Sequence, residues 1–517
     1  MDGNNSTQNH SGLGIDRLSS GEKSLRGRRI DLSYAAALAA SIAIWLFAIR
    51  APLWLDETGS FWIIRGGFSQ IWPNHYPSTT FPAYEYILWL GSKIFGSSEV
   101  GLRIPSLMAM LGAGYLLYLA ARELFDSELA VISTVLFCLN PLVIFASVDV
   151  RPYAFGMLAM NAAILCVVRM RRNRSLGLAV LFGLSSALVI YFHYLLGAIL
   201  PALLFCFFAV KGVDRTRQWR QLFIALAVFV LAILPVIPSL YALSHNTGSH
   251  VFEPKPTMME LLNTFVPVRF IAQSMPITIL FYIALAAAFL FAVILTHRRD
   301  SQIKIERWQI AVCAALALIP VLLLFGVSAG SPIHIFAERH RVEAASGIAL
   351  CWALLFTQVK NRGARVIFCL VLVAAAACQG YSSKGKHLYS WKSSLEFAER
   401  NASQDNAPVL ICSDYPESDY ATMPLDSAKE SRFFTQLSYY KLSVPVVPMP
   451  RTLNDEAVRV GTGLLVESEM NHQRFLALGY GGSYKELAWL AERAEGEFNE
   501  RVLGSFDGVV VVEFVPR

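Results

Sequence analysis

Apolar residues in this chain occur in long uninterrupted blocks, and the polar residues gather in short clusters between them. Each apolar block has about 17 to 22 residues, the length that an α-helix needs to cross the hydrocarbon core of a bilayer. The first block covers 32–49, and further blocks follow at approximately 102–120, 129–146, 154–168, 176–192, 195–210, 221–241, 276–296, 309–327, 343–359 and 365–380. The pattern predicts a polytopic α-helical membrane protein with about eleven transmembrane helices.

The two ends of the chain have a different composition. Residues 1–29 are rich in Gly, Ser, Asn and charge, which predicts a disordered tail. No small-residue cleavage pattern follows the first block, so we expect an uncleaved first span and a transmembrane domain over 30–382. Beyond this domain the composition becomes globular, and 388–517 is expected to form a small α/β domain. The strand-like runs are 409–412, 444–447, 464–466 and 509–514, and the helix-like runs are 431–441 and 484–494.

The segment 51–100 mixes aromatic residues with charges, which is typical of interfacial helices in an outer loop. The alternative is that 81–95 forms a short span that holds Glu85, which would reverse every later orientation. Charge counting favours the interfacial interpretation, because it places all the basic clusters between later spans on the side of the N-terminal tail. The N-terminus is then cytoplasmic, and the C-terminal domain is extracytoplasmic.

Composition and charge exclude several function classes. The chain has 517 residues, 55% hydrophobic and 16% charged, with a formal charge of +6. Basic clusters at span ends explain this charge without nucleic acid. Seven of the eight cysteines lie in apolar runs, so the sequence offers no disulfide framework. No Walker A loop, dinucleotide fingerprint or HExxH zinc motif occurs, which removes the usual signals of nucleotide-driven pumping and zinc proteolysis.

Two adjacent acids, Asp56 and Glu57, follow the first span at the level of the outer head groups. Acids at this position are costly unless they are solvated or paired, which indicates a functional role. The structural alternative is that Asp56 caps the following helix and Glu57 occupies its first turn.

Three arginines lie at the outer ends of spans, where the positive-inside rule disfavours them. They are Arg151, in the short turn before Pro152, and Arg339 and Arg341, in a charged group before a span. A guanidinium binds two oxygens of a phosphate at once, so these residues are the candidate phosphate ligands. The alternative for Arg151 is an ion pair with Asp149 or a snorkelling cation.

Tyr153, His193 and Glu85 are the candidate substrate-binding residues among the remaining outer polar groups. His193 could equally sit at the interface as an amphipathic side chain. A divalent metal ion held by His75, His334, His340 and Glu85 is a further alternative, although their spacing supports no metal site.

Short segments near the start of the chain occur in a characteristic order. After the first span come LWLDE at 53–57, FPAYEYIL at 81–88, GLRIPS at 101–106, AARELF at 120–125 and RPYA at 151–154. This order resembles the C-type membrane glycosyltransferases, and is most similar to the protein mannosyltransferase and lipid A aminoarabinose transferase group, with the related dolichyl-phosphate-mannose-type enzymes. The resemblance is best over roughly the first 200 residues.

This resemblance implies inverting transfer of a sugar from a polyprenyl phosphate to a lipid, glycan or protein acceptor on the outer face of a bacterial inner membrane. Asp56 matches the family's acidic base, and inversion needs one carboxylate to take the acceptor's proton. The leaving phosphate needs positive charge near its oxygens. The group at 339–343 lacks the proline-rich helix start of related proteins, so which arginine serves the phosphate stays open. The competing interpretations are a lipid or sugar transporter or flippase, and a lipid-linked oligosaccharide ligase.

Overall fold

A computed structural model describes most of the chain. The described residues are 31–75, 81–171, 175–210, 215–245, 254–266, 268, 275–296, 305–382, 391–413, 415, 432–451, 453–480 and 484–517. The predicted tail 1–29 lies outside them.

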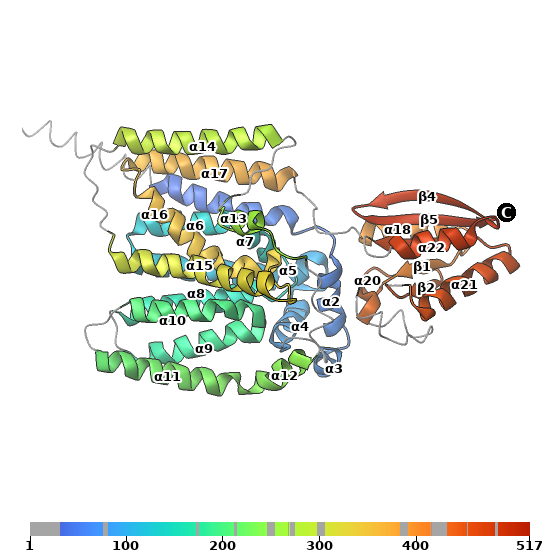
Figure 1. Cartoon of the computed structure of the whole chain (residues 1–517), viewed down its shortest axis with the longest axis horizontal. Coiled ribbons are helices and arrows are strands. Elements are labelled where there is room, and N and C mark those ends of the chain that lie inside the picture. The colour runs from blue at the N-terminus through green and yellow to red at the C-terminus, as the bar shows by residue number, and fades with distance from the viewer. Residues whose placement is uncertain are drawn as a thin grey trace, which may run out of the picture.

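Residues 31–382 form a helical bundle, and a smaller α/β domain lies at one end of it (Figure 1). Seven of the described helices are long and apolar enough to cross a membrane, or eight if one bent pair counts as a span. The predicted membrane fold is therefore confirmed, whereas the number of eleven spans is not. The long helices are Asp31–Ala48, α5 (Glu99–Leu124), α8 (Tyr153–Met170), α11 (Arg215–Ile233), α14 (Met275–Thr296), α15 (Arg307–Gly330) and α17 (Arg362–Ser382).

The structure has fewer spans than predicted because one predicted span is broken and three others are short helices. The predicted span 129–146 is broken into α6 (Ser127–Leu139) and α7 (Pro141–Ser147), which meet at 70°. Pro141 removes a backbone donor, and the Asn140 side chain accepts a hydrogen bond from Leu142 N at 3.0 Å to begin the second helix. Three predicted spans are shorter apolar helices, namely α9 (Leu176–Phe192), α10 (Leu200–Ala209) and α16 (Ala345–Phe356).

Short helices gather at the end of the bundle that faces the α/β domain. Figure 1 shows α2 (Leu55–Ile64) lying across this end. Helix α4 (Ala83–Phe95) has 13 residues. It is therefore about 20 Å long, less than the ~30 Å hydrocarbon core, which favours the interpretation of 81–95 as a non-spanning segment. The other short elements are α3 (Ile71–His75), α7, η3 (Tyr194–Ile199), α12 (Ile237–His245), α13 (Met258–Thr264) and η6 (Glu338–Ala344).

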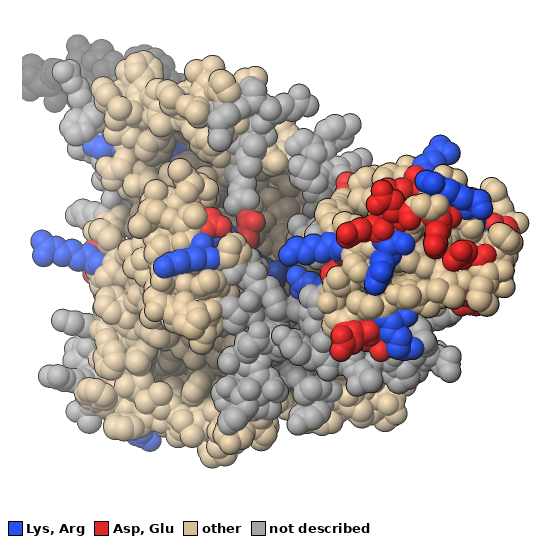
Figure 2. All heavy atoms as spheres, turned by 45° about the vertical axis from the view of Figure 1, so that its right-hand side comes forward, with Lys and Arg blue, Asp and Glu red and all other residues tan. Residues whose placement is uncertain are grey.

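The outer surface of the bundle is apolar, as expected of a surface in contact with lipid. Helix α14 exposes large apolar side chains, among them Leu290 and Phe291, each about 60% exposed. In Figure 2 charged side chains gather on the α/β domain, whereas the visible bundle surface carries few of them. This contrast matches one part in lipid and one part in water.

The α/β domain contains a five-stranded sheet of strand order β2-β1-β3-β5-β4. Strand β1 is parallel to β2 and β3, whereas β5 is antiparallel to β3 and β4. Helices cover both faces, and alternate strand residues such as Val409 and Leu410 enter separate apolar clusters. The elements are α18 (Trp391–Ala402), β1 (Val409–Cys412), α20 (Thr435–Tyr439), β2 (Val446–Met449), α21 (Asp455–Met470), β3 (Phe475–Tyr480), α22 (Tyr484–Ala494), β4 (Phe498–Phe506) and β5 (Val509–Pro516).

The prediction of a small α/β domain is confirmed, with two errors in its elements. The runs 409–412, 484–494 and 509–514 form the expected strand, helix and strand. The predicted strand at 464–466 is wrong, because the run lies inside α21, where Leu464 and Leu465 belong to the buried face and Val466 is exposed. Strands β3 and β4 were not predicted, since β3 contains Leu, Ala and Gly and no β-branched residue, and β4 is polar along most of its length.

Candidate active site

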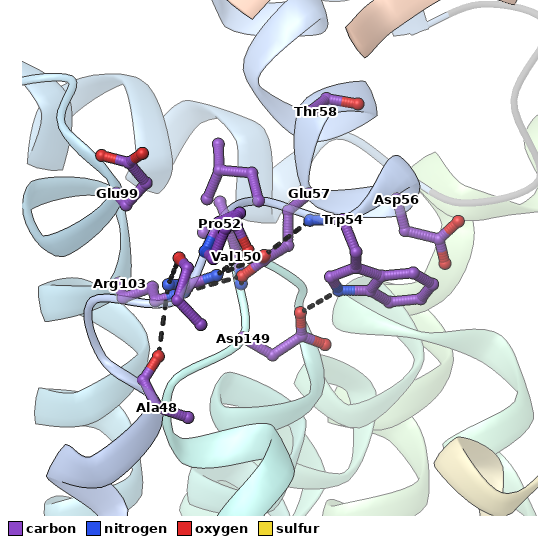
Figure 3. A network of polar contacts seen from close by, with 12 residues as sticks. Ala48, Pro52, Trp54, Asp56, Glu57, Thr58, Glu99, Arg103, Asp149 and Val150 are labelled. Atoms are coloured by element: carbon purple, nitrogen blue, oxygen red, sulfur yellow. Dashed lines mark hydrogen bonds and ion pairs between the residues drawn. The ribbon is translucent and has the colours of Figure 1, made fainter. Parts of the chain in front are cut away.

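Asp56 and Glu57 occupy the first turn of α2. Trp54 is the N-cap residue, and its backbone N–H donates to Glu57 Oε2 at 3.2 Å. Two acids in this turn also face the positive end of the helix dipole. Successive helical residues point about 100° apart, so the two carboxylates leave the helix in different directions. Figure 3 shows Glu57 directed towards Arg103 and Val150, and Asp56 directed away from them.

Glu57 forms a closed polar cluster with Arg103 of α5. Arg103 Nε lies 2.9 Å from Glu57 Oε1, Arg103 Nη2 lies 2.5 Å from Oε2, and neither side chain has exposed surface. Val150 N also donates to Oε1 at 2.9 Å. The remaining Arg103 protons bind the carbonyls of Ala48, Ile49, Ala51 and Pro52. The cluster fixes the chain between the first span and α2, and the Glu57 carboxylate has no face open to a substrate.

Asp149 extends this cluster towards Asp56. It is fully buried, and Trp54 Nε1 donates to its Oδ1 at 3.0 Å. Its Oδ2 is buried with no hydrogen-bond partner in the part of the chain that the structure describes. Burial and the nearby Glu57 carboxylate raise the Asp149 pKa well above its ordinary value. Its environment therefore disfavours the charged carboxylate, and the alternative ion pair of Arg151 with Asp149 is not among the described contacts.

Asp56 is paired with Arg151 instead. Arg151 Nε lies 3.9 Å from Asp56 Oδ2, and each side chain is 26% exposed. Burial alone would lower the Arg151 pKa, but Asp56 and the other nearby acidic groups together outweigh it, and the pKa is raised. Arg151 follows α7 and immediately precedes Pro152, the N-cap residue of α8. The bent α6–α7 pair therefore brings the loop that follows α7 against α2 and leaves an open carboxylate beside a cation.

A group of aromatic and basic side chains continues from Arg151 towards η6. The His193 ring lies 5.3 Å from the rings of both Tyr153 and His340, measured between centroids. The half-buried Arg339 follows in the same region. Burial and the charges of Arg339 and Arg151 lower the pKa of His193 well below its ordinary value and that of His340 to about 3. Both imidazoles are therefore neutral at pH 7.

The third predicted arginine has a different environment. Arg341 Nη1 donates to Glu260 O at 2.9 Å and to Thr264 Oγ1 at 2.8 Å, both in α13. Its guanidinium also lies 4.8 Å from the centroid of the Phe336 ring. The side chain is 6% exposed. The structure thus brings Arg151 and Arg339 together with Tyr153 and His193, and places Arg341 in the connection between η6 and α13.

Glu85 lies on α4 at the edge of this group. Its Oε1 is 3.7 Å from His75 Nδ1, and its Oε2 is buried without a hydrogen-bond partner among the described residues. Its negative charge acts on Arg151. For a metal ion, the described residues contain no cluster of three or more His, Cys, Asp or Glu side chains.

Sequence reasoning overlooked the contribution of Arg103 and of the C-terminal domain. The sequence did contain an indication of the role of Arg103, because an arginine within the first turns of a span needs a buried partner. The hydroxyl groups of Tyr415, Thr435 and Tyr440 contact residues 53–58. They come from more than 350 positions further along the chain, and no local pattern indicates this contact.

Comparison with known proteins agrees with this arrangement. Residues 77–241 match the model of the family described as dolichyl-phosphate-mannose-protein mannosyltransferase. No curated protein matches the sequence. The matched segment contains Glu85, Arg103, Arg151 and His193.

The chain is similar to several solved structures over more than nine-tenths of its length. ArnT from Cupriavidus metallidurans bound to undecaprenyl phosphate has a TM-score of 0.51 at 13% identity, over 94% of this chain and 97% of that one. Its apo form gives 0.46 at 15% identity, over 95% and 98% of the two chains. The Archaeoglobus fulgidus oligosaccharyltransferase gives 0.47 at 14% identity, over 92% and 74%. The family match over 77–241 confirms the resemblance to C-type membrane glycosyltransferases and indicates that the chain is a glycosyltransferase, whereas the likeness to ArnT concerns the fold.

Proposed function

We propose that this glycosyltransferase moves a sugar from a polyprenyl-phosphate donor to a lipid, glycan or protein acceptor, with inversion at the anomeric carbon. The observation that carries the proposal is the open Asp56 carboxylate beside Arg151, at the bundle end that faces the polar C-terminal domain. The ArnT of similar fold was solved with undecaprenyl phosphate, which supports this class of donor.

In the proposed reaction the acceptor hydroxyl oxygen attacks the anomeric carbon, and the bond from that carbon to the phosphate oxygen breaks. The hydroxyl proton passes to Asp56, and the electron pair of the broken bond stays on the phosphate. Glu57 is not available for this step, because all its described contacts hold Arg103, Val150 and the start of α2. We therefore assign the base to Asp56 and a structural role to Glu57.

Arg151 and Arg339 are the proposed ligands of the donor phosphate. Both act electrostatically on His193, so a phosphate near that ring would meet two positive charges. The contact of Arg151 with Asp56 is 3.9 Å, too long for a hydrogen bond, so an incoming phosphate competes with it at little cost. We propose that the donor draws Arg151 away and frees Asp56 for the acceptor. Tyr153, His193 and Glu85 line the donor side, and Arg341 holds η6.

We further propose that the site faces the outside of a bacterial inner membrane. The basic clusters of the sequence lie on the side of the N-terminal tail, which the positive-inside rule assigns to the cytoplasm. The site and the C-terminal domain lie at one end of the bundle (Figure 1). Outside the membrane no nucleotide sugar is needed, because a lipid phosphate carries the sugar.

The test is transfer of radiolabelled sugar from a panel of polyprenyl-phosphate sugars to native membrane extract, with Asp56→Asn as the comparison. Wild-type protein should move label from one donor, and the variant should turn over about 10²- to 10⁴-fold more slowly with donor binding retained. Full activity in the variant would remove Asp56 as the base. A folded wild-type protein that transfers no sugar from any donor would overturn the transferase and favour a lipid or sugar carrier.

A further inference from the structure

The C-terminal domain contacts residues 53–58, the segment that carries Asp56. Tyr440 Oη accepts a hydrogen bond from Leu53 N at 2.7 Å. Thr435 Oγ1 lies 2.8 Å from Thr58 Oγ1, and Tyr415 Oη donates to Leu55 O at 3.2 Å. These three hydroxyl groups bracket Asp56, with one contact before it and two around the first turn of α2.

Thr435 Oγ1 lies within hydrogen-bond distance of both Thr58 Oγ1 and Tyr415 Oη. Thr58 Oγ1 donates its single proton to Leu55 O at 2.7 Å, so Thr435 is the donor in the Thr58 contact. Thr435 Oγ1 also lies 3.0 Å from Tyr415 Oη, whose single proton is shared between this contact and Leu55 O. Thr58 and Thr435 are buried. Gly59 makes the close approach possible, because a Cβ at that position would lie 2.9 Å from Tyr415 Oη.

A second group of contacts reaches the start of α5, the helix that carries Arg103. Tyr439 Oη donates to Ser97 O at 2.9 Å, and its ring packs edge-on against Phe61 of α2 at 4.9 Å between centroids. Lys392 Nζ lies 2.9 Å from Glu99 Oε1. The domain therefore contacts both partners of the Glu57–Arg103 cluster, through the helices on which they lie.

Asp56 lies between these two sets of contacts and takes part in neither. Arg103 and Asp149 hold residues 48–57 from the bundle side, and the hydroxyl groups hold residues 53–58 from the domain side. The described side-chain contact of Asp56 is the long one to Arg151. The position of its carboxylate is thus set by the backbone of α2, which both sets of contacts hold.

We propose that Tyr440 and Thr435 are positioning residues for Asp56, so that the C-terminal domain is a working part of the catalytic site. This inference rests on the proposed function. A base must lie within hydrogen-bond reach of the proton it takes, and a displacement of about 1 Å can cost ~10²-fold in rate. Loss of these hydroxyl groups should therefore lower kcat and leave the KM for the donor unchanged, since Arg151 and Arg339 keep their places.

The test compares Tyr440→Phe and Thr435→Val with two matched controls in the full-length protein. Thr435→Ser keeps the hydroxyl and should retain wild-type kcat. Tyr484→Phe removes a hydroxyl group of the same domain that bonds Gly508 O at 2.7 Å, away from α2, and should change nothing. Steady-state kinetics are measured with the donor that the wild-type protein uses, and amide hydrogen exchange is followed over peptides that contain Leu53.

Tyr440→Phe and Thr435→Val should each lower kcat about tenfold at unchanged donor KM, and Tyr440→Phe should also speed exchange at Leu53. Wild-type kcat in both variants would overturn the positioning role, whatever the rate of amide hydrogen exchange at Leu53. A wild-type protein without transferase activity would instead overturn the proposed function, and that result needs no variant. If Tyr440→Phe does not fold, Thr435→Val against Thr435→Ser decides the proposal.

Discussion

Glu57 and Arg103 form an ion pair without exposed surface on either side chain, with Arg103 Nη2 2.5 Å from Glu57 Oε2. The next residue in the chain, Asp56, keeps a quarter of its side chain exposed and lies 3.9 Å from Arg151. Two adjacent acids thus have opposite environments, because successive helical residues point about 100° apart, and one is directed into the bundle and the other out of it. The buried acid supports the backbone of the open one, which is the arrangement that a fixed general base requires.

Glu57→Gln should destabilise the protein strongly. The change leaves the Arg103 charge buried without its partner, which costs about 3 to 5 kcal/mol in unfolding free energy. Asp56→Asn breaks a partly exposed contact and should cost about 1 kcal/mol or less. Thermal unfolding of the two variants in the same detergent measures the difference. A larger loss for Asp56→Asn would contradict the structural role of Glu57.

Arg151→Ala should weaken binding of polyprenyl phosphate. Loss of one charged hydrogen bond costs roughly 1.5 to 3 kcal/mol, or about 10- to 150-fold in Kd. Arg339→Ala should act in the same direction. Binding of a labelled polyprenyl phosphate without sugar measures both, independently of turnover.

Arg341→Ala is the matched control for these two arginines. Its guanidinium binds Glu260 O and Thr264 Oγ1, so its loss should lower stability and leave the Kd of folded protein near the wild-type value. Unchanged Kd in Arg151→Ala together with weaker binding in Arg341→Ala would reverse the assignment.

Asp149→Asn should be tolerated. Burial raises the Asp149 pKa well above its ordinary value, which disfavours the charged carboxylate, and a neutral amide replaces the carboxyl at nearly equal volume. We expect a change within about 1 kcal/mol at pH 7, with the Trp54 bond to Oδ1 preserved. Trp54→Phe removes the indole donor instead and should cost about 1 to 3 kcal/mol. Urea or thermal unfolding that ranks the variants in the opposite order would show that Asp149 is ionised.

His340 should make the protein less stable at acidic pH. Burial and the charge of Arg339 lower its pKa to about 3 in the folded state, below the ordinary value of 6.5. The unfolded chain then binds more protons between these values, so stability is full above pH 6.5 and falls as the pH drops towards 3, by about 1.4 kcal/mol per unit. His340→Asn, which keeps a donor for Ile335 O, should flatten this part of the profile. Unfolding temperatures at pH 7.5, 6.5 and 5.5 measure it, and equal slopes in both proteins would contradict the lowered pKa.

The sequence determined the membrane class of the fold, the polar outer residues and the type of the C-terminal domain. These properties depend on composition and periodicity, which are visible within any short segment of the sequence. It also singled out Asp56 as a candidate, because an acid at the end of a span is costly, and Arg151 and Arg339, because cations at that side disagree with the positive-inside rule. The bend after Asn140 was not predicted, because an apolar run is interpreted as one span whether or not a proline divides it.

The tertiary structure decided which of these polar residues meet. Glu57 and Asp56 are equivalent in the sequence, and only the position of Arg103 on α5 buries one of them. Arg339 and Arg341 are two positions apart in the sequence, and the structure places the Arg341 guanidinium against α13. The hydroxyl groups of Tyr440 and Thr435 reach α2 from the far end of the chain. Contacts of this kind depend on the relative placement of packed helices and domains, and a local sequence pattern carries no information about that placement.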